Sequence, residues 1–293
     1  MKHKVNDFHL NCHEGKIAVR DYGGHGENII LVHGAGQNLE VWQLLAEILN
    51  KKYKIWAFDL RGHGQTTVKS KNCLQYWQDI DTIIKGLKLD PKLLIGHSLG
   101  GYAVSAYIAW KNQNIPILLL DGFVLDKFEK RPEGINTRFD RELLWNLFKY
   151  GLETNKNEME EFIENEAINI SINNPNFGIS HELIKTFTRR SFFEINGKWI
   201  KKPTLDEMEI IAEPNGNEAI LPDVNIYKNL QSSIGFVVGT KGFYMNRKSE
   251  IIEIINQNKN RFYYEIDCGH NFIMTKPNET KDIVYDFLDK IKN

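Results

Sequence analysis

The sequence is poor in cysteine and has no long apolar run. Only three cysteines occur in 293 residues (Cys12, Cys73 and Cys268), and they form neither a C-x-x-C pair nor a metal-ligand spacing. So few cysteines indicate free thiols in a reducing compartment rather than a disulfide framework or a zinc site. No apolar run approaches the roughly 20 residues of a membrane span, and the N-terminus lacks a signal-peptide core. We therefore expect a soluble, cytoplasmic protein with no metal, no cofactor and no membrane span.

An excess of charge of either sign is also missing. The chain carries 37 lysines and arginines against 38 aspartates and glutamates, which gives a formal net charge of −1. A protein that binds nucleic acid or an anionic membrane would be expected to show a basic excess. Hydrophobic residues make up 42% of the chain, enough for a sizeable core in one or two domains. We expect a small-molecule partner, and a monomer or homodimer.

Apolar runs alternate with helical patterns over most of the chain. Strands are expected at 28–32, 53–59, 93–95, 115–120, 233–239 and 261–266, with an edge hairpin around Glu14-Gly15. Helices are expected between them, at roughly 39–49, 73–88, 101–111, 247–257 and 277–291. This alternation predicts parallel β-α-β units, and therefore an α/β fold.

The alternation stops after Asp121. From 122 to 229 the chain shows helical patterns, at 141–150, 156–170, 181–190 and 204–211, and a hairpin signal at Asn196-Gly197. The sequence therefore predicts one core domain, formed by residues 1–121 and 230–293, and a mainly helical insertion of residues 122–229. We call this segment the insertion.

The insertion is rich in aromatic and basic side chains. Its aromatic residues are interpreted chiefly as a small core, with Phe192 and Trp199 as candidates to control substrate size. Its basic residues are interpreted as a solvated face, with attraction of an anionic group as the alternative. They are Arg189, Arg190, Lys198, Lys201 and Lys202.

The segment Gly96-His97-Ser98-Leu99-Gly100 fits the pattern G-x-S-x-G between a short apolar strand and a helix. A direct turn from strand to helix forces the corner residue into a strained conformation, and flanking glycines remove the Cβ atoms that would clash. The corner side chain then projects from the sheet beside the free N–H groups and positive end of the helix. These conditions suit a nucleophile, so Ser98 is the candidate.

A serine nucleophile needs a base, and His270 is the candidate. It follows a late strand in a loop that leads to the last helix. In a parallel sheet such loops lie at the carboxyl edge, where the elbow also lies. The other histidines near glycines, His33, His63 and His97, are interpreted as packing residues.

Attack on a carbonyl also needs two preorganised N–H donors for the oxyanion. One expected donor is the backbone N–H of Leu99, directly after the serine. The other is the backbone N–H of Ala35, in the glycine-rich loop His33-Gly34-Ala35-Gly36.

Together these motifs resemble those of α/β-hydrolase-fold esterases and lipase-like enzymes with a cap domain. The resemblance covers nearly the whole core, through the segments HGAG, FDLRGHG, GHSLGG and DCGHNFIMTKP. It implies a mostly parallel central sheet of about eight strands flanked by helices, with a mainly helical cap inserted after the strand ending at Asp121. It also implies that Ser98 is the nucleophile and His270 the general base, with Leu99 and Ala35 in the oxyanion hole. The insertion matches the cap by position only.

The catalytic acid departs from the commonest pattern of this family. Many members carry an aspartate shortly after the strand that precedes the histidine strand, where this sequence has Gly239-Thr240-Lys241-Gly242. Other members take the acid from the end of the strand after the nucleophile helix, where Asp121 stands. The resemblance thus makes Asp121 the candidate acid, with Asp126 in reserve and Asp267 as a third possibility.

The function expected from the resemblance is serine hydrolysis of a carboxylic ester of a small to medium, largely apolar substrate. Lactones, thioesters and carbon–carbon bonds remain open as alternatives. A non-catalytic small-molecule receptor on the same fold is a rival, because the usual acid is missing. Dinucleotide binding is a weaker rival, since Gly34-x-Gly36 lacks the third glycine of that fingerprint and has Leu39 there.

Overall fold

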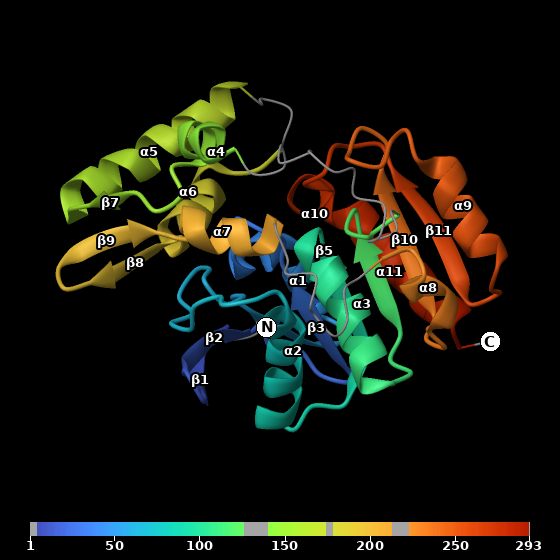
Figure 1. Cartoon of the computed structure of the whole chain (residues 1–293). Helices are drawn as coiled ribbons and strands as arrows, with labels where there is room; N and C mark the ends of the chain where they lie inside the picture. The colour runs from blue at the N-terminus through green and yellow to red at the C-terminus, as the bar shows by residue number, and fades with distance from the viewer. Residues whose placement is uncertain (1–4, 126–139, 174–177, 213–222, 293) are drawn as a thin grey trace.

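The computed structural model describes residues 5–125, 140–173, 178–212 and 223–292, and an eight-stranded sheet lies at its centre (Figure 1). The spatial order of the strands is β1-β2-β4-β3-β5-β6-β10-β11. Their bounds are Asn6–Cys12 (β1), Gly15–Asp21 (β2), Asn28–Val32 (β3), Lys54–Phe58 (β4), Pro91–His97 (β5), Ile117–Leu120 (β6), Ile234–Gly239 (β10) and Arg261–Ile266 (β11).

The sheet is parallel except at one edge. The pairs β1–β2 and β2–β4 are antiparallel, and every pairing from β4 to β11 is parallel. The inner strands are continuously apolar, as in the fully buried run ILLL of β6, because helices cover both faces of a parallel sheet. The expected mostly parallel sheet of about eight strands is therefore confirmed.

Helices pack on both faces of the sheet, so the core domain has three layers. Side chains along each strand alternate between two apolar clusters, as Ile30 and Val32 lie in one cluster while Ile29 and Leu31 lie in the other. The first cluster is covered by α2 (Leu74–Gly86), α3 (Leu99–Lys111) and α9 (Lys248–Asn256). The second is covered by η1 (Leu39–Trp42), α1 (Gln43–Leu49), α10 (Phe272–Thr275) and α11 (Pro277–Lys290).

The insertion follows β6, and its described helices and strands, except the last helix, lie to one side of the central sheet (Figure 1). Its helices are α4 (Arg141–Phe148), α5 (Lys156–Asn173), α6 (His181–Arg190), α7 (Leu205–Ala212) and α8 (Ile226–Asn229), of which α8 packs against α3. Its strands β7 (Glu153–Thr154), β8 (Phe192–Ile195) and β9 (Lys198–Lys201) form a small antiparallel sheet. The expected hairpin is confirmed, since Asn196 and Gly197 both have positive φ in the turn between β8 and β9.

The structure bears on two interpretations of the insertion's side chains. Phe192 is fully buried against Met159 and Ile163, so it belongs to the small core that was expected for the aromatic residues of the insertion. The basic residues do not form one solvated face, because Arg190 and Lys202 point inward: Lys202 Nζ donates to the carbonyl of Thr66 at 2.6 Å. None of the helices within the described ranges is both long and apolar enough to cross a bilayer.

Candidate active site

Ser98 is the corner residue between β5 and α3. Its backbone has φ 51° and ψ −121°, outside the favoured regions for a residue with a side chain. The turn is tight enough to need the flanking glycines: a Cβ on Gly96 would overlap the backbone of Gly100, and a Cβ on Gly100 would overlap Val32. The G-x-S-x-G spacing therefore has a steric cause in this fold, and it leaves the serine held in a strained conformation.

The first residue of α3 is Leu99, directly after the elbow. Its backbone N–H has no protein acceptor among the described residues, as expected for the first turn of a helix. The helix runs for 13 residues, so its positive dipole end lies beside Ser98. An oxyanion formed next to the serine would meet an unpaired donor here.

The glycine-rich loop 33–37 lies against the elbow. A Cβ built on Gly34 would be 2.8 Å from the Cβ of Ser98. Three backbone N–H groups of this loop are already used, because Gly34 donates to Gln37 Oε1 at 2.9 Å, Gly36 donates to His63 Nε2 at 3.1 Å and Gln37 donates to the carbonyl of Gly34 at 3.2 Å. The backbone N–H of Ala35 has no acceptor within the described part of the chain. Ala35 is thus a loop residue with an unpaired donor.

Two buried histidines hold this loop in place. His33 accepts the backbone N–H of Leu60 at Nε2 (2.9 Å) and donates from Nδ1 to the carbonyl of Gly34 (2.8 Å). His63 accepts from Gly36 at Nε2 and donates from Nδ1 to the carbonyl of Arg61 (2.8 Å). Each pattern needs a neutral imidazole, and burial lowers the pKa of both rings to about 3. Their predicted packing role is confirmed.

Asp121 and His270 are in direct contact. Asp121 follows β6, is buried and has φ 45°. Its Oδ2 accepts a hydrogen bond of 2.6 Å from His270 Nδ1, and its oxygens also lie 3.3 Å from the backbone N–H groups of Gly239 and Phe243. With the Nδ1 proton engaged, Nε2 of His270 is the nitrogen that can accept a proton. The predicted neighbourhood of the strands ending at Asp121 and Gly239 is confirmed, since β6 pairs with β10.

Of the two other candidate acids, the structure describes Asp267. The side chain of Asp267 is 78% exposed and binds Lys241 (2.8 Å) and Thr240 (3.0 Å), and the Lys241 hydrogen bond lowers its pKa. Asp267 therefore fixes its own loop. Asp126 lies outside the described residues.

A polar cluster that the sequence reasoning missed connects the three loops. Gln37, besides accepting from Gly34, donates from Nε2 to Asn271 Oδ1 at 3.0 Å, and its Oε1 lies 3.0 Å from His97 Nδ1. His97 Nε2 lies 2.9 Å from the backbone carbonyl of His270. The cluster joins the elbow, the glycine-rich loop and the histidine loop. Its members are too far apart in the chain for any local spacing to reveal them.

Comparison with known proteins adds a family match. The profile of the alpha/beta hydrolase fold matches residues 27–161. Protein phosphatase methylesterase 1 of Mus musculus is 34% identical over 125 residues, which are 39% of this chain and 32% of that protein, so the match spans about a third of the relative. Monoacylglycerol lipase ABHD6 of Mus musculus is 22% identical across 99% of this chain and 84% of its own.

Solved structures share the fold over nearly the whole chain. E-2-(acetamidomethylene)succinate hydrolase superposes with a TM-score of 0.75 at 17% identity, over 98% of this chain and all of the other. A thioesterase domain from the curacin biosynthetic pathway superposes with a TM-score of 0.74 at 18% identity, over 97% and 99%. The sheet order, the partial profile match and these superpositions agree, and the chain has the α/β-hydrolase fold.

Proposed function

We propose that the protein is a serine hydrolase that cleaves a carboxylic ester through an acyl-enzyme. The observation that carries the proposal is the 2.6 Å contact between His270 Nδ1 and Asp121 Oδ2 at the carboxyl edge of the sheet, where the strained elbow of Ser98 also lies. A carboxylate bound to Nδ1 keeps the imidazole in the tautomer whose Nε2 can accept a proton. The roles of Ser98, His270 and Asp121 form one proposal.

The proposed reaction has two halves. Ser98 Oγ adds to the ester carbonyl while His270 Nε2 takes the hydroxyl proton, and Asp121 stabilises the resulting imidazolium. The oxyanion accepts hydrogen bonds from the backbone N–H groups of Leu99 and Ala35. The alcohol leaves with the proton from His270. Water then gives a proton to His270 and attacks the acyl group, and the acid is released as Ser98 regains its proton.

Phe243 supports a substrate that has an apolar group next to its reacting carbonyl. Its ring packs against the His270 imidazole, with centroids 4.0 Å apart and an interplanar angle of 31°, while 73% of the residue is exposed. One face of the ring thus shields the base and the other is open to a ligand. The relatives' names include a methylesterase and a monoacylglycerol lipase, so we assign a small to medium, largely apolar carboxylic ester to this chain. Lactones and thioesters have the same chemistry.

The insertion is proposed to act as a cap over the site. Tyr150, which follows α4, is buried against the glycine-rich loop, and a Cβ on Gly36 would overlap its hydroxyl. The insertion therefore reaches the loop that carries the Ala35 donor.

The three cysteines have free thiols, which favours a reducing compartment such as the cytoplasm.

A panel of p-nitrophenyl esters of increasing acyl length, with a lactone and a thioester, tests this proposal. Turnover of at least one class, lost in Ser98→Ala, is the expected result. Absence of both turnover and fluorophosphonate labelling in the folded wild-type protein would favour the rival, a non-catalytic small-molecule receptor.

A further inference from the structure

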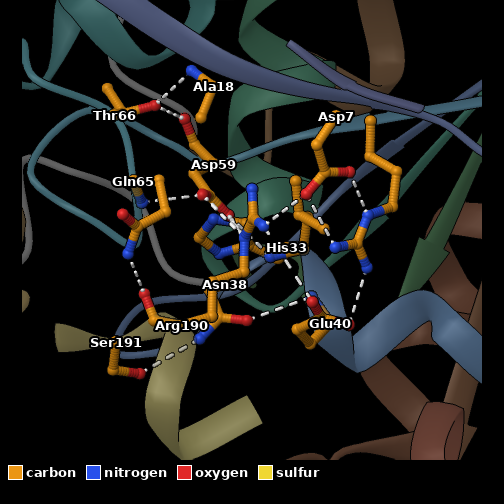
Figure 2. A network of polar contacts seen from close by, with 12 residues as sticks. Asp7, Ala18, His33, Asn38, Glu40, Asp59, Gln65, Thr66, Arg190 and Ser191 are labelled. Atoms are coloured by element: carbon orange, nitrogen blue, oxygen red, sulfur yellow. Dashed lines mark hydrogen bonds and ion pairs between the residues drawn. The ribbon is translucent and has the colours of Figure 1, made fainter. Parts of the chain in front are cut away.

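Arg190, the last residue of α6, enters a largely buried network of charges at the border between the insertion and the core (Figure 2). Its Nε donates to Asp59 Oδ2 at 3.0 Å and its Nη1 to Asp7 Oδ2 at 2.8 Å, with Glu40 3.9 Å away. The Asp59 side chain is fully buried and that of Arg190 is 9% exposed. Arg20 completes the network through Asp7 and Glu40.

Asp59 does more than pair with Arg190. Its Oδ1 accepts the backbone N–H of Leu39 at 2.9 Å, and its Oδ2 accepts that of Gln65 at 2.8 Å. Leu39 opens η1, two residues after the glycine-rich loop ends at Gln37. The carboxylate therefore fixes the chain at the point where this loop leaves the site.

Asn38 provides a second, uncharged link between the end of α6 and the residues that follow the glycine-rich loop. Asn38 Nδ2 donates to the carbonyl of Phe187 at 2.9 Å and lies 3.0 Å from Ser191 Oγ, at the last turn of α6. Asn38 Oδ1 accepts the backbone N–H of Glu40 at 3.0 Å. The three residues that follow the glycine-rich loop are thus all bonded to the end of α6 or to a partner of Arg190.

The guanidinium is needed for this arrangement on electrostatic grounds. Burial alone would lower the pKa of Arg190, but the charge of Asp59 raises it, so the side chain stays charged. Without it, Asp59 would be a buried carboxylate with Asp7 and Glu40 nearby, and Arg20 and the more distant Lys202 would have to offset all three charges. A buried carboxylate that has lost its paired cation turns toward water or toward another cation. That movement weakens its bond to the N–H of Leu39.

We propose that Arg190 is a positioning residue for the oxyanion hole: it acts through Asp59 and Leu39 on the loop that carries the Ala35 donor. The insertion thereby contributes to catalysis without touching the substrate. This inference rests on the proposed serine hydrolysis.

The neighbouring arginine provides a matched control. Arg189 is 43% exposed and pairs with Glu160 on the surface of the insertion. Kinetic constants for p-nitrophenyl acetate are compared for wild type, Arg190→Met, Arg190→Lys and Arg189→Met, each normalised to folded protein by circular dichroism. We expect Arg190→Met to lower kcat by about tenfold or more with KM little changed, since losing one oxyanion donor costs about 10² to 10³. Arg190→Lys should recover part of the loss, and Arg189→Met should match wild type.

Amide hydrogen exchange gives a readout that does not depend on activity. Peptides covering residues 34–39 should exchange faster in Arg190→Met and, more weakly, in Asn38→Ala, but not in Arg189→Met. If Arg190→Met does not fold, Arg190→Lys and Asn38→Ala carry the same comparison. Wild-type kcat with unchanged exchange in the folded variants would overturn the proposal. A different outcome is faster exchange in Arg190→Met together with no esterase activity in the wild-type protein. That result would contradict the proposed function and leave the coupling between Arg190 and the loop in place.

Discussion

The carboxylate of Asp121 occupies the space that a side chain on Gly242 would need: an ideal Cβ on Gly242 would lie 2.6 Å from Asp121 Oδ2. Asp121 follows β6 and Gly242 follows β10, and these two strands are neighbours in the sheet. Both residues therefore lie at its carboxyl edge. Only one of these positions can therefore carry a carboxylate toward His270 Nδ1. The glycine that looked like a missing acid is the residue that makes room for it.

Asp121→Asn should lower ester turnover by about 10³ to 10⁴, by analogy with triads whose acid is changed to the amide. The amide can no longer stabilise the imidazolium. Steady-state kinetics of the folded variant measure the loss, with Asp267→Asn as the control that should cost little. Near-wild-type turnover in Asp121→Asn would remove Asp121 from the proposed triad.

The acid should be movable between the two positions. In the double variant Asp121→Asn, Gly242→Asp, the side chains at the two positions collide. In the double variant Asp121→Gly, Gly242→Asp, no side chain remains at position 121, and the new glycine stands at a positive φ, which glycine tolerates. We expect the second pair to recover more of the lost kcat than the first. Equal or reversed recovery would contradict the steric argument, and recovery in neither pair would show that the two carboxylate positions are not equivalent.

Stability should fall as the pH drops from about 6.5 toward 3 because of His33 and His63. Their folded pKa of about 3 lies below the ordinary 6.5, so the unfolded chain takes up protons in this range that the folded chain excludes. This contribution is complete above pH 6.5 and is lost as the pH falls toward 3, by about 1.4 kcal/mol per pH unit for each histidine at most. Urea unfolding should show a smaller pH slope for His63→Gln, and an unchanged slope for the exposed His13→Asn.

Phe243→Ala should change the preference between acyl chain lengths more than it changes turnover of a small acetate ester. Its ring offers an open apolar face beside His270, while its contact with Asp121 comes from the backbone, which the substitution keeps. We expect KM to rise more for hexanoate than for acetate esters of p-nitrophenol. Met245→Ala, also at an exposed apolar side chain of this loop, is the control. A uniform change across acyl lengths would contradict an acyl-binding role.

Phe192→Ala should act on stability instead. The ring fills the small core of the insertion with Met159 and Ile163, and removing a buried phenylalanine costs about 3–5 kcal/mol. Denaturant unfolding should show this loss, and Phe243→Ala should show much less. If Phe192→Ala changed the acyl preference and kept normal stability, this prediction would be wrong and Phe192 would be assigned to the substrate pocket.

Sequence patterns located the features that depend on neighbouring residues. The elbow around Ser98 and the hairpin at Asn196-Gly197 were predicted because their local backbone needs particular residues. Arg189 and Arg190 show the limit of such patterns. They are identical neighbours in the chain, yet one lies on the surface and the other binds Asp59, 131 residues away. Pairings over such distances depend on packing that no local pattern encodes.

The central claim is that Ser98 is activated by His270, and fluorophosphonate labelling followed by intact-mass and peptide analysis tests it most directly. Only a serine whose proton can be accepted reacts quickly with this probe. Wild type should gain a single adduct at Ser98, Ser98→Ala should gain none, and His270→Ala should label far more slowly while keeping its fold. An adduct on another residue, or rapid labelling of Ser98 in His270→Ala, would contradict the account.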